Sequence, residues 1–273
     1  MTAPQSDDHM ISEASQNDGG LAWPLIIKDF GTVQGSFVWS SAWTGNGFPA
    51  AGAAPAATPG TQYDNTDGSS WFAHDPQASK HLTWWMAPPS QRGSVVLYDR
   101  LVAVSGLSLA STGNKTVASA ALLRSVKGLD VEAWLEITTQ TATTGAVVSA
   151  NSYTNQAGTT GRAGTTVTLP AVTVVGSMFH LPLQAGDNGV RAVSTINVAT
   201  AASAGACNLV LLRRLGQIQI TTNGKPSFES FRSRPNMAKT LPKLEDGATL
   251  ALMGMFSANA ATTCAAGVWG VKT

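Results

Sequence analysis

The sequence has little charge and little cysteine. Only 12% of its 273 residues are Asp, Glu, Lys or Arg, about half the share of a usual soluble domain. The 17 basic and 16 acidic residues leave a net charge of +1, so no overall field attracts nucleic acid. We therefore expect large uncharged faces, which tend to mark association with other proteins and not with nucleic acid.

Membrane and secretion signals are also missing from the sequence. The longest apolar runs are interrupted by Asp99 and Arg100, so no window approaches the roughly 20 apolar residues of a spanning helix. The first 20 residues contain neither the basic segment nor the apolar core of a secretory signal. We expect a chain that is either cytosolic in origin or assembled inside a cell before release, and that has no membrane partner.

The two cysteines, Cys207 and Cys264, are too few for a disulfide framework. Each follows a run of small residues and opens an apolar stretch, which indicates two similar strand starts. Two buried thiols are the favoured interpretation. A disulfide, either between the two or between subunits, is the alternative.

The chain divides by composition into three regions. Residues 1–20 are polar and end in Gly-Gly, which predicts a disordered tail or one ordered by a partner. Residues 21–92 are rich in Pro, Ala and Trp, and recurring prolines exclude regular helices, so we predict an extended, irregular arm. Within it, strands are expected over 23–30 and 34–43. Its tryptophans are candidate interface residues, namely Trp23, Trp71, Trp84 and Trp85.

Residues 93–273 are predicted to form the folded body of the protein. Val131 to Ile137 alternates between apolar and polar positions, the period of a half-buried strand. Asn-Gly pairs at Asn188 and Asn223 are typical of hairpin turns. Since no clear amphipathic helix separates the strands, the pattern predicts an all-β protein, an antiparallel β-sandwich or jelly roll. The best helix candidate is short, Pro226 to Ser233. Residues 117–124 could form a helix or a strand, and a strand is favoured.

A search for chemistry gives no catalytic, cofactor or metal site. Glu132 and Glu136 share one strand face about 13 to 14 Å apart, too far for a glycosidase pair, so we predict a solvated face. His180 lies in an apolar run and is interpreted as a structural histidine. The loop from Asp64 to Asp67 is rich in oxygen ligands, but it lacks the distal Glu of a calcium loop, so a turn is favoured over a calcium site.

Arg213 and Arg214 form the one paired cationic feature in the strand region. The preceding residues alternate poorly, which predicts a strand buried on both faces until the arginines end it. Two roles stay open for the pair. Protection of an exposed edge from aggregation is favoured, and a salt bridge to a neighbouring subunit is the second role.

Four segments of the strand region resemble virion structural proteins of tailed bacteriophages. They are VVLYDRLVAVSGLS, SYTNQAGTTGR, LPLQAGDNGVRAVSTI and NLVLLRRL, and the resemblance covers Val95 to Ile220. It implies a particle component that is assembled in the host cytoplasm and resides in the virion, and it favours a capsid decoration (cement) protein on the outer lattice. It carries no functional residues with it.

The resemblance also implies partners, namely the major capsid protein or other virion proteins. Multiple copies acting together would supply affinity, and a homotrimer is the favoured oligomer. A collar, tail or fibre-associated protein that binds the host surface is the alternative role. A carbohydrate-active enzyme is disfavoured, because the acidic residues of the chain are scattered.

Overall fold

The computed structural model describes residues 20–22, 26–32, 38–48, 50–64, 80–87, 89–225, 227–230, 243–245, 247–257 and 261–272. Within these ranges every regular element is a β-strand, and all paired strands are antiparallel. The predicted all-β, antiparallel class is therefore confirmed. Among the described residues there is no helix that is long and apolar enough to cross a membrane.

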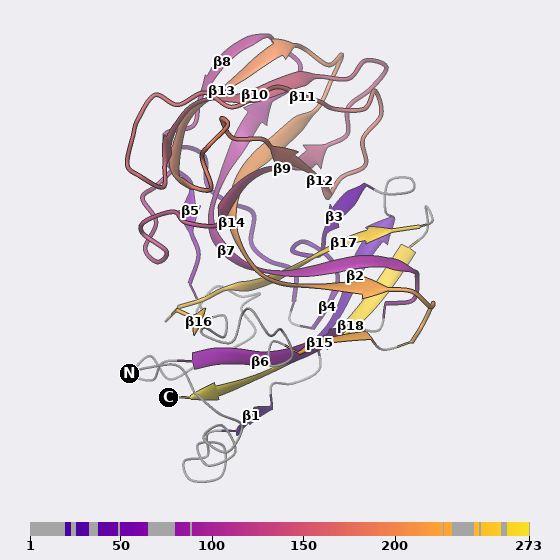
Figure 1. Ribbon diagram of the computed structural model, residues 1–273. Coiled ribbons are helices and arrows are strands. Elements are labelled where there is room, and N and C mark those ends of the chain that lie inside the picture. The colour runs from indigo at the N-terminus through magenta and orange to yellow at the C-terminus, as the bar shows by residue number, and fades with distance from the viewer. Residues whose placement is uncertain are drawn as a thin grey trace.

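The strands fall into three sheets (Figure 1). The upper sheet, in the order β11-β10-β13-β8, consists of β8 (Gly113–Thr116), β10 (Val147–Asn155), β11 (Val167–Thr168) and β13 (Val190–Thr200). The lower sheet consists of β1 (Gly20–Ala22), β2 (Ile26–Thr32), β4 (Gly47–Phe48), β6 (Lys80–Ala87), β15 (Ser227–Ser230), β16 (Lys243–Leu244) and β18 (Ala261–Lys272). The middle sheet consists of β3 (Trp39–Ser41), β5 (Thr61–Gln62), β7 (Gly93–Ser108), β9 (Val131–Thr139), β12 (Ser177–Leu181), β14 (Ala206–Ile220) and β17 (Leu250–Phe256).

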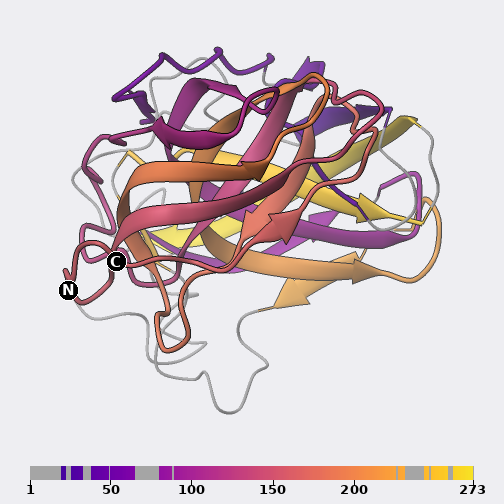
Figure 2. The same ribbon diagram turned by 90° about the horizontal axis from the view of Figure 1, so that it is seen from above.

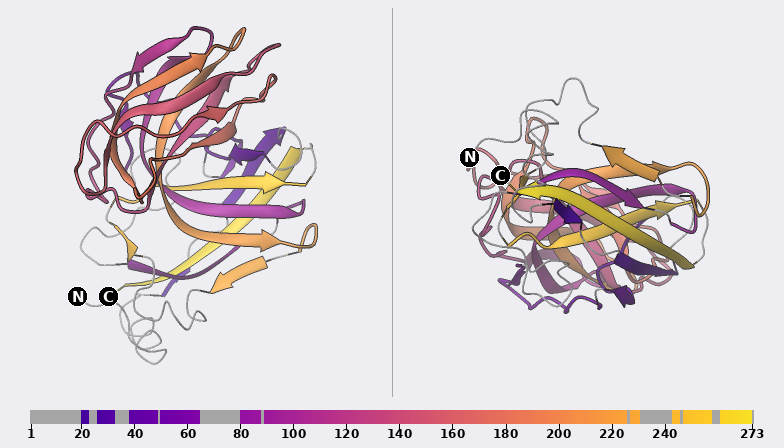
Figure 3. Two further views of the ribbon diagram at one scale, coloured as in Figure 1. Left: turned by 45° about the horizontal axis from the view of Figure 1, so that its top comes forward. Right: turned by 90° about the horizontal axis from the view of Figure 1, so that it is seen from below.

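The middle sheet closes on itself. Its order is β14-β9-β12-β3-β17-β7, and β14 also pairs with β7, so these strands form a six-stranded barrel to which β5 adds at one side. The barrel lies between the upper and the lower sheet in Figure 1, and Figures 2 and 3 show the same layers from other directions. The architecture is therefore a barrel flanked by two sheets, and not a plain two-sheet sandwich.

Two hydrophobic cores lie outside the barrel: the upper core, between the barrel and the upper sheet, and the lower core, between the barrel and the lower sheet. Strands β7 and β14 are long enough to contribute to both cores and so connect the layers. Residues Val95 and Leu97 at the start of β7 pack in the lower core, whereas Val102 and Val104 pack in the upper core. The ladder between β7 and β14 has three register shifts, which increase local bending and twist. The two strands can therefore face one core with their first half and the other core with their second half.

Alternation along β9 decides what lies on each side of the barrel wall. Val131, Ala133, Leu135 and Ile137 pack in the upper core, as the period-two pattern predicts. The opposite face is mostly buried, which corrects the prediction of a solvated face: Glu136 is 2% exposed, and Glu132 is only partly exposed. This face lines the barrel lumen, where the buried side chains are Trp43, Tyr63, Val96, Tyr98, Ala103, Trp134, Met178, Val210, Leu212, Ala251 and Met253.

In the N-terminal region, predicted as an extended, irregular arm, the described residues include strands that pair with the barrel. β3 bridges β12 and β17 and so completes the barrel, while β5 pairs with β7. Within the described residues, the strands expected over 23–30 and 34–43 are observed as β2 and β3. The physical reason for this incorporation is that unpaired strand edges in the barrel need backbone partners, and β3 supplies them.

Two further local predictions differ from the structure. The helix expected over Pro226–Ser233 is wrong where the chain is described, because Ser227–Ser230 is strand β15 and pairs with β6. Residues 117–124, assigned to a strand, belong to an irregular loop between β8 and β9. In both cases tertiary pairing, and not local propensity, determines the conformation.

Candidate functional site

The barrel lumen holds a fully buried ion pair. Arg100 on β7 and Glu136 on β9 are 1% and 2% exposed, and their Nη2 and Oε2 atoms lie 2.9 Å apart. The Arg100 guanidinium stacks over the rings of Trp43 and Tyr63, with its central carbon 4.6 and 5.1 Å from the two ring centroids. Asn208 Nδ2 donates to Glu136 from β14 at 3.5 Å. Both charges are thus paired and shielded by aromatic rings.

In this pair, the neighbouring charges and hydrogen bonds together outweigh burial in their effect on the pKa of each group. Burial on its own raises the pKa of the Glu136 carboxyl, but the adjacent Arg100 outweighs burial and leaves that pKa below its usual value. Burial likewise opposes the charge on Arg100, and Glu136 overcomes it. Both groups therefore stay ionised, so neither is a proton donor or acceptor for a reaction near neutral pH.

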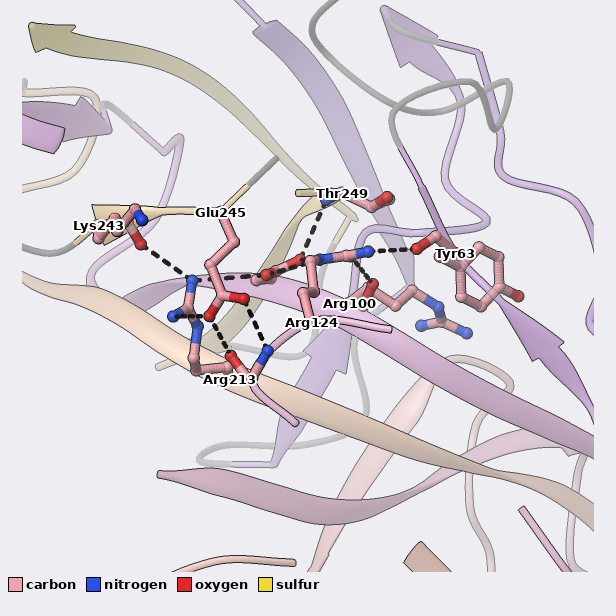
Figure 4. A network of polar contacts seen from close by, with 9 residues as sticks. Tyr63, Arg100, Arg124, Arg213, Lys243, Glu245 and Thr249 are labelled. Carbon is pink, nitrogen blue, oxygen red and sulfur yellow. Dashed lines mark hydrogen bonds and ion pairs between the residues drawn. The ribbon is translucent and has the colours of Figure 1, made fainter. Parts of the chain in front are cut away.

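A second polar network lies on the outer side of the barrel wall (Figure 4). Arg124 Nε lies 3.1 and 3.0 Å from the two carboxylate oxygens of Asp99, and Nη2 lies 2.7 Å from one of them. Arg124 also donates to the carbonyl oxygens of Tyr63 and Arg100. The Thr249 N–H donates to Asp99 at 3.0 Å. One buried arginine therefore fastens its own loop to β7 and to Tyr63, the residue directly after β5.

Arg213 extends this network to β14 and to the segment after β16. Its Nη1 lies 2.9 Å from Glu245 and its Nη2 lies 3.6 Å from Asp99, while Nη2 also donates to the carbonyl of Lys243. The N–H and the hydroxyl of Ser125 each donate to Glu245 at 2.7 Å. Burial alone would raise the pKa of Glu245, but Ser125 and Arg213 outweigh it and leave that pKa lowered.

A third group of polar side chains lies on the lumen face beside Trp134. Glu132 accepts from the Trp134 indole at 2.8 Å and from the Tyr98 hydroxyl at 3.1 Å, and Arg214 Nη2 lies 3.3 Å from it. His180, which is exposed, contacts the Trp134 ring at a centroid distance of 5.1 Å. Partial burial lowers the pKa of His180, with Glu132 opposing that effect. Imidazole, carboxylate and guanidinium therefore meet here around aromatic rings.

The candidate interface residues named from the sequence are placed as follows. Trp23 and Trp71 lie outside the described residues. Trp84 and Trp85 are in β6, between β15 and β18 in the lower sheet. Arg213 and Arg214 lie within β14 and not at its end, and both form ion pairs inside the chain. The protein's own carboxylates therefore occupy both arginines.

The two candidate thiols lie in different cores. Cys207 packs in the upper core and Cys264 in the lower core, and burial raises the pKa of both thiols to about 12. Of the calcium-like loop, only Asp64 belongs to the described residues. No group of three or more His, Cys, Asp or Glu side chains in the described ranges is arranged to hold a metal ion.

Sequence reasoning missed the ion pairs that organise the molecule. In the sequence, Asp99 and Arg100 appear only as interruptions of an apolar run, and Arg124 only as the last residue of an expected strand. A charged residue inside a run of buried strand residues is the signal that could have found Asp99 and Arg100, because such a residue needs a partner. The sequence offers no signal for which partner each one takes.

Comparisons with known proteins give little. Neither a scan against protein-family models nor a search of curated proteins finds a match. Among solved structures, the chain has a weak likeness to a structure of the infectious bursal disease virus Gt strain, at 9% identity over 94% of this chain and 82% of that chain, with a TM-score of 0.18. The VP2 subviral particle of the same virus gives 8% identity, the same coverages and the same TM-score. At such TM-scores the likeness says nothing about the fold or function of this chain.

Proposed function

We propose that the chain is a non-enzymatic structural protein of a virus particle, and specifically a decoration protein on the head of a tailed bacteriophage. The phage assignment comes from the resemblance of Val95–Ile220 to virion proteins of this kind. The observation that carries the structural role is the way in which the molecule uses its few charges. Several of them form buried ion pairs that brace the barrel, whereas seven large apolar side chains of the described residues are exposed.

The charge pairs belong to the framework. Arg100–Glu136 crosses the lumen, and Asp99–Arg124 and Arg213–Glu245 join separate chain segments outside it. The pKa values of Glu136 and Glu245 are lowered by their partners, so these two carboxylates stay ionised and are unsuited to acid–base chemistry near neutral pH. These pairs hold strands and loops in one arrangement, which suits a protein that must keep its shape within a lattice.

The outward-facing apolar residues support association. Large apolar side chains that are about half or more exposed occur on several loops and on the β2–β4 pair; they are Ile27, Phe48, Leu123, Val126, Leu129, Val172 and Val175. When a partner covers apolar surface of this kind, the free energy of the complex falls relative to that of the separate molecules. We propose the major capsid protein, neighbouring virion proteins and further copies of this chain, in a trimer, as those partners.

Within this proposal the candidate interface residues keep their role. Trp23, Trp71, Trp84 and Trp85 are proposed to contact the particle, since large aromatic side chains dominate the energetics of many interfaces. Arg214 has a side chain that is 44% exposed despite its pair with Glu132, so it can still reach a neighbour at the rim of a contact. The Arg213 side chain is only 15% exposed, so it is less accessible to a neighbour than Arg214 is.

The copy number in purified particles tests the proposed function. Quantitative mass spectrometry of particles produced with this gene should find hundreds of copies, against a capsid protein of known copy number as internal standard. About a dozen copies or fewer would place the chain in the neck or tail, and absence from the particle would overturn a virion role. Particles made without the gene should still assemble, but lose their genome at lower temperature.

A host-binding virion protein is a second candidate, and the polar group around Trp134 favours it. Exposed His180 and Arg214 lie beside Trp134 and Glu132, a combination of aromatic rings with donors and acceptors that suits sugar recognition. Binding of the purified chain to host cells, abolished by Arg214→Ala and retained by Arg191→Ala, would support this candidate over decoration. Arg191 is a suitable control because its guanidinium bonds only to the Gln156 carbonyl among described contacts.

A further inference from the structure

Strands β7 and β14 run side by side beyond the point where β9 begins, and one face of this extension is polar (Figure 1). β14 pairs with β9 only as far as Arg213, but it continues to Ile220. One face of the extension packs in the lower core through Leu215, Ile218 and Ile220. The opposite face continues the lumen face of the barrel, and it carries polar side chains that solvent reaches.

Hydrogen bonds connect the polar side chains of this face into a row. Gln217 and Gln219 both donate to the Ser94 hydroxyl, at 2.8 and 3.3 Å. Arg214 donates to the side-chain carbonyl of Gln217 at 3.2 Å. Arg214 and Gln219, at the two ends of the row, are exposed and lie roughly 16 Å apart along the strand. The row therefore presents fixed polar groups to an extended ligand and not to a single small ion.

Arg214 connects this row to the polar group around Trp134. Its Nη2 lies 3.3 Å from Glu132, and its guanidinium carbon lies 5.9 Å from the centroid of the Tyr98 ring. The second oxygen of Glu132 accepts from the Trp134 indole and from the Tyr98 hydroxyl. Even so, the side chains of Arg214 and Glu132 are 44% and 24% exposed. Both charges are therefore held in place at the surface, where a ligand can still contact them.

Two rings flank Trp134 on the same side of the barrel wall. His180 lies edge-on to it at a centroid distance of 5.1 Å, and Trp39 does so at 6.4 Å. Trp134 itself is buried, whereas Trp39 is partly exposed and His180 is exposed. The rings that a ligand can touch are therefore those of Trp39 and His180.

Several hydrogen-bonding atoms of this surface have no hydrogen-bond partner among the described residues. They are the ring nitrogens of His180, Nε of Arg214 and Oε1 of Gln219. Together they offer both donors and acceptors. A hydroxyl group, which donates one hydrogen bond and accepts others, can use either kind.

The surface carries no net charge near neutral pH. Glu132 balances Arg214, and burial lowers the pKa of His180 below its usual value, so that its ring is neutral. None of the seven large apolar side chains that the described residues expose lies on this surface. An uncharged ligand rich in hydroxyl groups therefore suits it better than an anion or an apolar protein surface does.

We propose that this surface, from Gln219 through Arg214 to His180, binds a neutral oligosaccharide. The free atoms of these three side chains bind sugar hydroxyls, and Trp39 packs against the apolar face of one sugar ring. The inference goes beyond the proposed decoration role. It uses side chains of the host-binding candidate, and it adds the class of ligand and the extension of the site along β14.

Affinity electrophoresis of the full chain tests the proposal, in gels that contain a neutral glucan, mannan or galactan, or the acidic polymer polygalacturonate. At least one neutral polymer should retard the wild type. Gln219→Ala and His180→Ala, at the two ends of the site, should each weaken that binding by about tenfold, because each removes a hydrogen bond to the sugar. Gln184→Ala, which truncates an exposed glutamine between β12 and β13, is the matched control and should bind like the wild type.

Three outcomes would overturn the proposal: no retardation by any neutral polymer, retardation by polygalacturonate alone, or binding that survives both substitutions. Circular dichroism checks that the variants fold, and His180→Gln provides a second variant that should keep part of the binding through its amide. The experiments on the proposed function fail separately. A chain that is absent from particles can still bind a polymer, and a chain that ignores host cells can bind a sugar that those cells lack.

Discussion

Asp99 and Arg100 are adjacent in β7, yet their side chains lie on opposite sides of the barrel wall and in different ion pairs. Asp99 binds Arg124 outside the barrel at 2.7 Å, and Arg100 binds Glu136 inside it at 2.9 Å. Two buried charges of opposite sign therefore do not neutralise each other, although they are neighbours in sequence. Each holds a different part of the fold, the outer one a loop and the inner one the facing strand.

Arg100→Met is expected to destabilise the protein by about 3 to 5 kcal/mol, because Glu136 is left buried without its counter-charge. The free energy of unfolding, measured by guanidinium chloride denaturation, tests this. The double variant Arg100→Met with Glu136→Leu should be more stable than the single variant, since no unpaired charge remains. Equal stability of Arg100→Met and the wild type would mean that the lumen is hydrated and that the pair contributes little.

Replacing the charged Arg124 by Leu is expected to destabilise the protein far more than replacing the apolar Leu123 by Ala, because Arg124 is buried and Leu123 is exposed. Loss of Arg124 leaves the fully buried Asp99 with a more distant cation, Arg213 at 3.6 Å, and should cost about 3 kcal/mol. Loss of the exposed Leu123 side chain should change the free energy of unfolding of the monomer by less than about 0.5 kcal/mol. Urea denaturation at low protein concentration measures both, and a larger effect at Leu123 than at Arg124 would contradict the burial of Arg124 and the exposure of Leu123.

For β9, the sequence correctly predicts that the apolar face is buried but wrongly predicts that the face with Glu136 is solvated. Alternation identifies the apolar face, because Val131, Ala133, Leu135 and Ile137 are buried by any sheet that packs on them. It cannot show that the other face lines a lumen, since closure depends on β3 and β17, which are distant in sequence. The alternation therefore predicts a solvated Glu136, whereas Arg100, on a strand distant in sequence, pairs with it inside the barrel.

The candidate site was predictable in part, for a related reason. Burial of Cys207 and Cys264 follows from their apolar contexts, and the structure places both thiols in cores. Arg213 and Arg214 stood out as a pair, but their partners come from segments that no local pattern connects to β14. Long-range ion pairs depend on tertiary structure, whereas thiol burial depends mostly on neighbours along the strand.

Acid should weaken the loop contacts around Asp187 in a defined range. The hydrogen bonds from Arg162 and Tyr153 lower the pKa of Asp187 to about 2, which is below the value of about 3.9 for an unfolded chain. Its contribution to stability is therefore fully present above about pH 4 and is lost as the pH falls towards about 2.

Thermal denaturation of the wild type and of Asp187→Asn between neutral and acidic pH tests this. The wild type should have the higher melting temperature at neutral pH, and the difference should shrink in the acid range as Asp187 becomes protonated. A difference that is constant across the whole range would show that the carboxylate charge is not what stabilises the loops. Asp130→Asn is a suitable control, because Asp130 is exposed.

The two thiols should report the opening of the two cores separately. Cys207 and Cys264 are almost fully buried and their pKa values are raised to about 12, so at neutral pH they are protonated and inaccessible to an aromatic disulfide reagent. In the single-thiol variants Cys207→Ala and Cys264→Ala, labelling should proceed only as fast as the protein unfolds. Because β7 and β14 run through both cores, we expect the same rate for the two variants, followed by mass spectrometry. Faster labelling of Cys264 would mean that the lower sheet opens independently of the barrel, and immediate labelling of either thiol would contradict its burial.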